Sequence, residues 1–115
     1  MQLRVIRADD SVKHLALAGR LDLKGVNDIQ YEFVHEATML PRDTLVDLSR
    51  VTFIASIGIG MLVSVAKALE QQGAAMVLLK PTVLVRQTIE MSSLHDLIPI
   101  ADDEPRALEL LKEHA

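Results

Sequence analysis

The spacing of apolar residues along this chain changes repeatedly between the period of a strand and that of a helix. This alternation limits the folds that are available to the chain. At the start, Leu3 and Val5 alternate with polar neighbours. After a turn, Leu15, Leu17 and Leu21 repeat the same spacing of two residues. A period of two places every second side chain on one face of a strand. The opening of the chain therefore predicts two antiparallel strands.

Beyond this hairpin, segments of helical period alternate with short apolar runs. The predicted helices run from after Asp22 to Pro41, from Ser56–Gly58 to Gly73, from Pro81 to Met91, and from Asp102–Pro105 onward. The predicted strands between them cover residues 44–48, 74–79 and 97–100, the last of which contains Pro99 and belongs at a sheet edge or end. The order β-β-α-β-α-β-α-β-α indicates an α/β fold with a mixed, mostly parallel sheet and four helices.

Helical spacing also predicts which side chains of each helix turn inward. The first helix places Val26, Ile29, Phe33, Ala37 and Leu40 on one face, the second turns Ile59, Leu62, Val63, Ala66 and Leu69 to the sheet, and the last carries Leu108 and Leu111 inward. The third helix is outlined by Leu84, Val85, Thr88 and Met91. A second stripe of the second helix carries Met61, Val65, Ala68 and Gln72, also at spacings of three and four. This stripe is interpreted either as partly buried or as a patch for a partner.

Length and charge narrow the classes of protein further. A chain of 115 residues suits one domain, predicted to span 1–115, and it contains no cysteine for disulfides or thiolate sites. The formal charge is −4, without a basic stripe, and aromatic residues make up only 3% of the chain, which argues against nucleic acid. No apolar run is long enough to span a bilayer, and the charged opening residues are unlike a signal peptide. We expect a cytoplasmic protein with no membrane insertion.

Motifs for enzymatic chemistry are weak. The sequence from Gly58 to Val63 lacks the third small residue and the later acid of a dinucleotide loop, and no serine lies in a nucleophile elbow. The histidines share no metal-ligand spacing, so no metal site and no cofactor are expected. Asp22 and Asp47 are candidate acids, but capping of a turn explains Asp22 and a hydrogen bond to a loop amide explains Asp47. We expect no catalytic residues and no enzyme.

Ser56 has a more distinctive position. It precedes a helix start that contains two glycines, where its hydroxyl is predicted to act as the N-cap. The free amides and the dipole of a helix start would also stabilise a phosphate on this hydroxyl. Ser56 is therefore either a capping residue or a site of phosphorylation.

The segment TLVDLSRVTFIASIGIGMLVSVAKAL at residues 44–69 resembles the STAS domain of anti-sigma factor antagonists. The resemblance extends to Gly19-Arg20-Leu21-Asp22, to Lys80-Pro81 and to the run from Met91 to Ile100. It covers nearly the whole chain in element order and implies a STAS-like α/β fold.

This resemblance implies a switch. In the family, a serine in an Asp-Ser-Ser-Gly motif is phosphorylated by an anti-sigma factor that is also a serine kinase of the GHKL type, and a PP2C-type phosphatase reverses the reaction. The unphosphorylated antagonist binds the anti-sigma factor, and the kinase brings the ATP and magnesium. Here the motif is Ala55-Ser56-Ile57-Gly58, so Ser56 aligns with the modified serine.

The motif departs from the family at two positions. Ala55 replaces the usual aspartate and Ile57 replaces the second serine. Loss of the acid either weakens recognition by a kinase or reduces the repulsion between a carboxylate and a new phosphate. The residues predicted to bind a partner are those of the motif and the adjacent faces: Asp22, Ala55, Ser56, Ile57, Gly58, Met61, Val65 and Ala68.

Two other hypotheses remain. The altered motif also fits an accessory subunit that is not phosphorylated, similar to the lone STAS proteins that bind the ATPase of an ABC-type lipid transport system. The last hypothesis is a small acid–base enzyme that uses Asp22 or Asp47, which would require a pocket where polar groups converge.

Overall fold

The computed structural model of the chain describes residues 1–9 and 11–114, and it contains one five-stranded sheet in the order β1-β2-β3-β4-β5. The strands are β1 (Gln2–Ala8), β2 (Val12–Leu21), β3 (Asp43–Ile54), β4 (Met76–Leu79) and β5 (Ile100–Ala101). β1 pairs antiparallel with β2, and all other pairs are parallel. The mixed, mostly parallel sheet predicted from the alternation of periods is confirmed.

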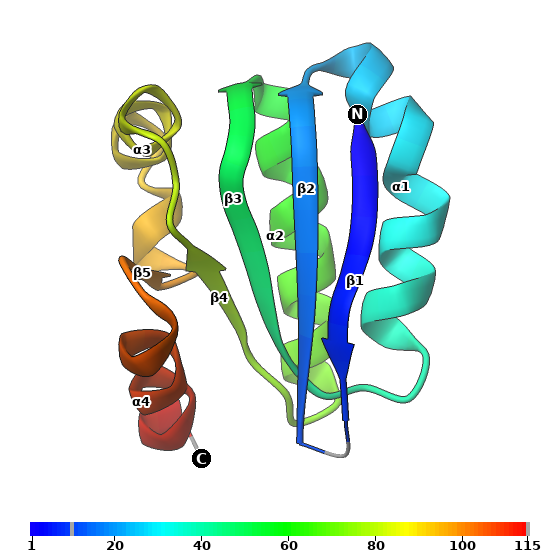
Figure 1. Cartoon of the computed structure of the whole chain (residues 1–115), viewed down its shortest axis with the longest axis vertical. Helices are drawn as coiled ribbons and strands as arrows, with labels where there is room; N and C mark the ends of the chain where they lie inside the picture. The colour runs from blue at the N-terminus through cyan, green and yellow to red at the C-terminus, as the bar shows by residue number, and fades with distance from the viewer. Residues whose placement is uncertain (10, 115) are drawn as a thin grey trace.

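The helices cover the two faces of this sheet unequally. They are α1 (Leu23–Thr38), α2 (Ser56–Gln71), α3 (Val83–Met91) and α4 (Glu104–His114), with a short 3₁₀ turn over Leu94–Asp96. Figure 1 shows α1 and α2 behind the sheet, where they pack against each other. No helix in the described chain combines the length and apolar character that crossing a membrane requires.

Two hydrophobic clusters lie on opposite faces of the sheet. The alternation of side chains along β4 separates them: Met76 and Leu78 join the cluster under α1, α2 and α3, whereas Val77 and Leu79 join the cluster under α4. The second cluster reaches only Val12 of β2 and none of β1. The face opposite α1 and α2 is therefore covered over β4 and β5 and open over β1, β2 and the distal half of β3.

The turn between β1 and β2 is organised by one carboxylate. Asp9 Oδ1 accepts hydrogen bonds from the backbone amides of Ser11 and Val12, each at 2.9 Å. These bonds stabilise the charged form and lower the pKa of Asp9 to about 2. The turn predicted from the sequence at this position is confirmed.

Some boundaries and inward faces differ from the prediction. β3 continues to Ile54, although the prediction ended at residue 48, because Ser49, Arg50 and Thr52 are polar residues on an open, solvated part of the sheet. The last strand was predicted over residues 97–100 but covers Ile100–Ala101. Pro99 has no amide hydrogen and contributes only its carbonyl, which accepts from Leu78 N at 2.9 Å.

The apolar residues that outlined the third helix are not all buried. Val85 and Ile89 are buried, but Leu84 and Met91 are 57% and 88% exposed. Leu40 in the first helical pattern lies beyond the end of α1 and is 74% exposed. The periodic pattern in these segments continued into residues that the core does not reach.

Candidate functional site

The carboxyl ends of β2 and β3 meet at one edge of the sheet, where α1 and α2 begin. β4 ends lower, with Leu79 opposite Asp47, and residues 80–82 lead from it to the start of α3. In Figure 1 the arrowheads of β2 and β3 point to this upper edge. The backbone amide of Ala55 donates to the carbonyl of Leu21 (3.0 Å), which joins the turn after β3 to the turn after β2. Thr82 Oγ1 donates to the carbonyl of Val51 (3.2 Å) and ties the start of α3 to β3. Crevices at the carboxyl ends of parallel strands are common sites of function.

The start of α1 is fully capped. Asp22 is the N-cap, as the capping interpretation predicted, and its Oδ1 accepts from Gly25 N at 2.9 Å. Arg20 Nε donates to Oδ2 at 3.2 Å. The bond from the Gly25 amide, followed by the bond and charge of Arg20, lowers the pKa of Asp22. This carboxylate is therefore engaged in holding the start of α1.

The start of α2 has no such cap. The prediction that Ser56 is the N-cap was wrong: Ala55 occupies that position and has no side-chain oxygen, while Ser56 is the first helical residue and is exposed. The carbonyl of Ala55 accepts from the amides of Gly58 (2.9 Å) and Ile59 (3.1 Å). The hydroxyl of Ser56 therefore projects into solvent beside an uncapped helix start, where the dipole favours negative charge.

Gly58 presses this helix start against β2. A Cβ built at Gly58 would lie 2.7 Å from both the carbonyl oxygen and Cγ of Leu21. Only glycine permits this approach, so Gly58 is buried and acts by positioning Ser56 and not by touching a partner.

Large apolar side chains are exposed in the first turns of all three helices that follow β2, β3 and β4. They are Leu23 at 62% exposed, Ile57 at 41%, Val83 at 76% and Leu84 at 57%. We call these four residues together with Ser56 the Ser56 edge. Clustered exposure of large apolar side chains is typical of an interaction surface. Of these apolar residues the prediction of a partner site named only Ile57, and the signal that it missed was a large apolar residue at the first or second position after each N-cap.

The second stripe of α2 is largely buried, which confirms one of its two interpretations and contradicts the prediction of a patch for a partner. Met61 and Val65 are only 4% and 2% exposed, and both belong to the main hydrophobic cluster, while Ala68 is half-buried. The prediction failed because α2 packs against α1 as well as the sheet, which buries a second flank of the helix. Ile59, Val63 and Ala66, which were predicted to face the sheet, are only partly buried.

The remaining polar candidates do not form a second site. Asp47 Oδ1 accepts from the amide of Ser49 at 2.8 Å, which confirms the loop hydrogen bond predicted for it. Asp47 and Asp22 lie on different elements and share no hollow. Within residues 1–9 and 11–113, no cluster of three or more His, Asp or Glu side chains could hold a metal ion.

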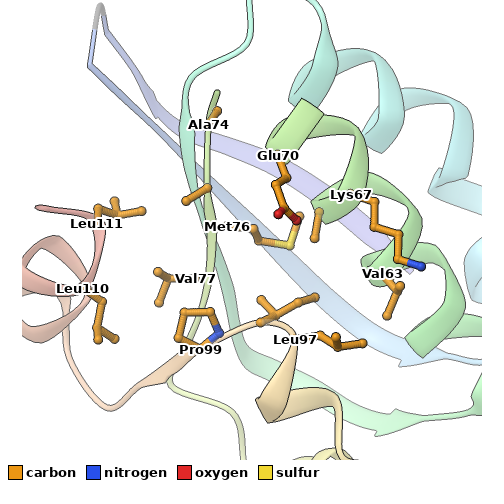
Figure 2. A pocket seen from close by; sticks show the side chains of 13 residues that line it. Val63, Lys67, Glu70, Ala74, Met76, Val77, Leu97, Pro99, Leu110 and Leu111 are labelled. Carbon is orange, nitrogen blue, oxygen red and sulfur yellow. The ribbon is translucent and has the colours of Figure 1, made fainter. Parts of the chain in front are cut away.

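A hollow of about 130 Å³ lies away from the Ser56 edge, between α2, β4, α4 and the segment before β5. Figure 2 shows Val63, Met76 and Leu97 on its walls and Lys67 and Glu70 on α2 beside it. It exists because β5 pairs only with Leu78 and Leu79, which leaves the first half of β4 without a partner on that side. None of the predicted site residues lines this hollow.

The comparisons with known proteins agree with this geometry. The family model described as "Mlab, STAS domain" matches residues 5–99. The chain belongs to this STAS domain family, as the resemblance predicted. No curated protein matches the sequence significantly.

Solved structures share the fold. An anti-sigma-factor antagonist (STAS) domain protein from Planctomyces limnophilus is similar with a TM-score of 0.81 and 20% identity, over 96% of this chain and 97% of that one. An anti-sigma factor antagonist from Mycobacterium paratuberculosis has a TM-score of 0.81 and 18% identity, over 96% and 95% of the two chains. The phosphorylated form of the Bacillus cell fate determinant SpoIIAA has a TM-score of 0.68 and 20% identity, over 95% and 99%. At these identities the likeness concerns the fold.

Proposed function

We propose that this protein is an anti-sigma factor antagonist that binds a serine-kinase anti-sigma factor of the GHKL type through the Ser56 edge. Phosphorylation of Ser56 releases the partner, and a PP2C-type phosphatase restores binding. The protein is then a substrate and a ligand, not an enzyme, and the kinase supplies the ATP and magnesium. The observation that carries the proposal is an exposed serine hydroxyl at an uncapped helix start, bordered by exposed apolar side chains.

Charge explains how one modification would switch this surface. A phosphate on Ser56 adds a charge of about −1.5 to −2. The apolar members of the Ser56 edge would be desolvated against a partner, and a doubly charged group beside them opposes that desolvation. The phosphate would meanwhile be tolerated in the free protein because the free amides and dipole of α2 favour an anion.

The test begins with the kinase. The purified protein is incubated with a candidate GHKL-type kinase and ATP, and the product is mapped by tandem mass spectrometry. We expect modification at Ser56, and binding to the kinase weakened at least tenfold by Ser56→Glu. Ser64→Glu is the matched control, because Ser64 is also exposed on α2, two turns further on. An unmodified Ser56, with full binding retained by Ser56→Glu, would contradict the switch.

The apolar part of the Ser56 edge needs its own variant. Ile57→Ser should weaken binding of the unmodified protein about tenfold, since a central apolar anchor contributes at least this much to an interface. Tyr31→Ser is a control on the exposed side of α1, where the side chain is 86% exposed. Equal affinity of the Ile57 and Tyr31 variants would place the interface elsewhere.

A second candidate function is an accessory subunit of an ABC-type lipid transport complex. The family match and the replacement of the motif aspartate by Ala55 favour it. Affinity capture with the wild-type and Ser56→Glu proteins distinguishes the two functions. A kinase that is retained only by the wild type supports the switch, whereas an ABC ATPase retained by both supports the subunit.

A further inference from the structure

The open part of the sheet carries two arginines that line one hollow. Arg4 of β1 and Arg50 of β3 border a space of about 120 Å³, together with Gln2 and the residues 16–18 of β2. It lies on the face opposite α1 and α2, beyond the part that α4 covers. It is separate from the Ser56 edge and from the hollow of Figure 2.

Strand register explains why these two side chains share a space. Arg4 is opposite Ala16 in the antiparallel pair, and Arg50 is opposite Ala18 in the parallel pair. Directly opposed residues project to the same face, as do residues two apart on one strand. The two guanidinium groups therefore stand on either side of a floor made of two methyl groups. Gln2, which is opposite Ala18, adds an amide on the side of β1.

Neither guanidinium is paired with a carboxylate in the part of the chain that the structure describes. The arginine ion pairs of the described chain involve Arg7, Arg20, Arg86 and Arg106. Among the described residues, no carboxylate lies within ion-pair distance of Arg4 or Arg50.

The nearest acid in the register is Asp47, across Ala16 from Arg4. Its carboxylate is engaged elsewhere, at 2.8 Å from the Ser49 amide and 3.9 Å from His14 Nε2. It does not line the hollow.

We propose that this hollow binds a small, doubly charged oxyanion of the size of phosphate. Two cations that border one small space repel each other, and an anion between them reverses the sign of that interaction. Guanidinium groups bind oxyanions through paired hydrogen bonds. A space of about 120 Å³ is large enough to admit a group of five heavy atoms. The proposed ligand is the free anion, which the test uses directly.

The test uses inorganic phosphate as the probe. The full chain is titrated in a buffer free of other oxyanions, at constant ionic strength set with sodium chloride, and followed by ¹H–¹⁵N correlation spectra that include the arginine Nε–Hε signals. We expect saturable shifts at residues 16–18 and at the Nε–Hε groups of Arg4 and Arg50, with a Kd of a few millimolar or lower. Acetate, which has one charge, should bind at least fivefold more weakly.

Variants of the two arginines distinguish a specific phosphate site from a nonspecific attraction of phosphate to positive charge. Arg4→Gln and Arg50→Gln should each weaken phosphate binding at least fivefold, and the double variant should abolish it. Arg7→Gln is the matched control on the same strand, because Arg7 is already paired with Asp9 (3.5 Å) and Glu104 (3.4 Å). It should bind phosphate like the wild type. Shifts that do not saturate, or that persist unchanged in the double variant, would overturn the proposal.

Thermal stability gives a second measurement that does not depend on spectra. Without phosphate, the double variant should be at least as stable as the wild type, since it loses only a repulsion. Added phosphate should raise the Tm of the wild type and of Arg7→Gln but not that of the double variant. An equal rise in all three would mean that phosphate acts without this site.

Discussion

The starts of α1 and α2 are two versions of one structure at neighbouring strand ends. Each begins with an extended cap residue and has a glycine three residues later, as Asp22 and Gly25 in α1 and as Ala55 and Gly58 in α2. The cap backbones are nearly identical, with φ −104° and ψ −167° at Asp22 and φ −101° and ψ 171° at Ala55. The cap side chains differ, and so does the acceptor of the glycine amide, which is the Asp22 carboxylate for Gly25 and the Ala55 carbonyl for Gly58. One start is closed by a carboxylate, and the other leaves its first amides available beside an exposed serine.

The largest effects on stability should come from substitution of the glycine that each helix start contains. A Cβ at Gly25 would lie 1.9 Å from the carbonyl oxygen of Arg20, and one at Gly58 would lie 2.7 Å from that of Leu21. Gly25→Ala should lower the free energy of unfolding by more than about 3 kcal/mol, and Gly58→Ala by about 1–3 kcal/mol, because backbone must move in both. Urea denaturation followed by circular dichroism measures both.

Gly60→Ala is the control for these two variants. Gly60 lies within α2, and a Cβ there has nothing within 4 Å. Alanine should stabilise the protein by about 0.5–1 kcal/mol through its helix propensity. A loss of stability in this variant, or no loss in Gly25→Ala, would show that close approach does not set the position of these helices.

The spacing of apolar residues shows how much of this fold could be predicted from the sequence. Alternating periods predicted every strand and helix, because periodicity reflects which side chains a core must bury. The same rule misassigned Met61 and Val65, which are buried because a second helix packs beside α2. Contacts between helices depend on three-dimensional arrangement and leave little trace in one segment's spacing.

The candidate site was partly predictable for a similar reason. Ser56 stands out through its neighbours in sequence, whereas Leu23, Val83 and Leu84 stand at the starts of other helices and their exposure follows from the fold. The identity of the cap depends on a shift of one residue, from Ser56 to Ala55. Helix boundaries are not determined to that precision by periodicity.

Substitution of the two cap residues should change the stability of the protein in opposite directions. Asp22→Ala removes the bond to Gly25 N and should lower the Tm by several degrees. Ala55→Asp should offer a carboxylate to Gly58 N, which in the wild type donates to the Ala55 carbonyl (2.9 Å), and should stabilise the protein by about 0.5–1 kcal/mol, because the backbone at residue 55 already has the geometry of a cap. Thermal unfolding of both variants checks this. A destabilised Ala55→Asp protein would mean that the two starts are not equivalent.

Acid should distinguish the two starts without mutation. The folded pKa of Asp22 is below its ordinary value of 3.8, so its contribution to stability is complete above that value and is lost as the pH falls through the folded pKa. The amide signal of Gly25 should therefore titrate below pH 4, while that of Gly58 should not. Asp9, with a pKa of about 2, contributes to the same acid loss of global stability, so the local amide signals are the decisive readout. Parallel titration of both amides would contradict the comparison.

The smallest expected effect concerns Ser56 itself. Ser56→Glu places a carboxylate in the first turn of an uncapped helix, where the dipole should stabilise the protein by about 0.3–1 kcal/mol at low salt. Ser64→Glu lies in the middle of the same helix and should show no such gain. The gain should shrink in high salt, since surface charge interactions are screened. A stable Ser56→Glu protein that no longer binds its partner would locate the loss at the Ser56 edge, because a folding defect would lower stability and binding together.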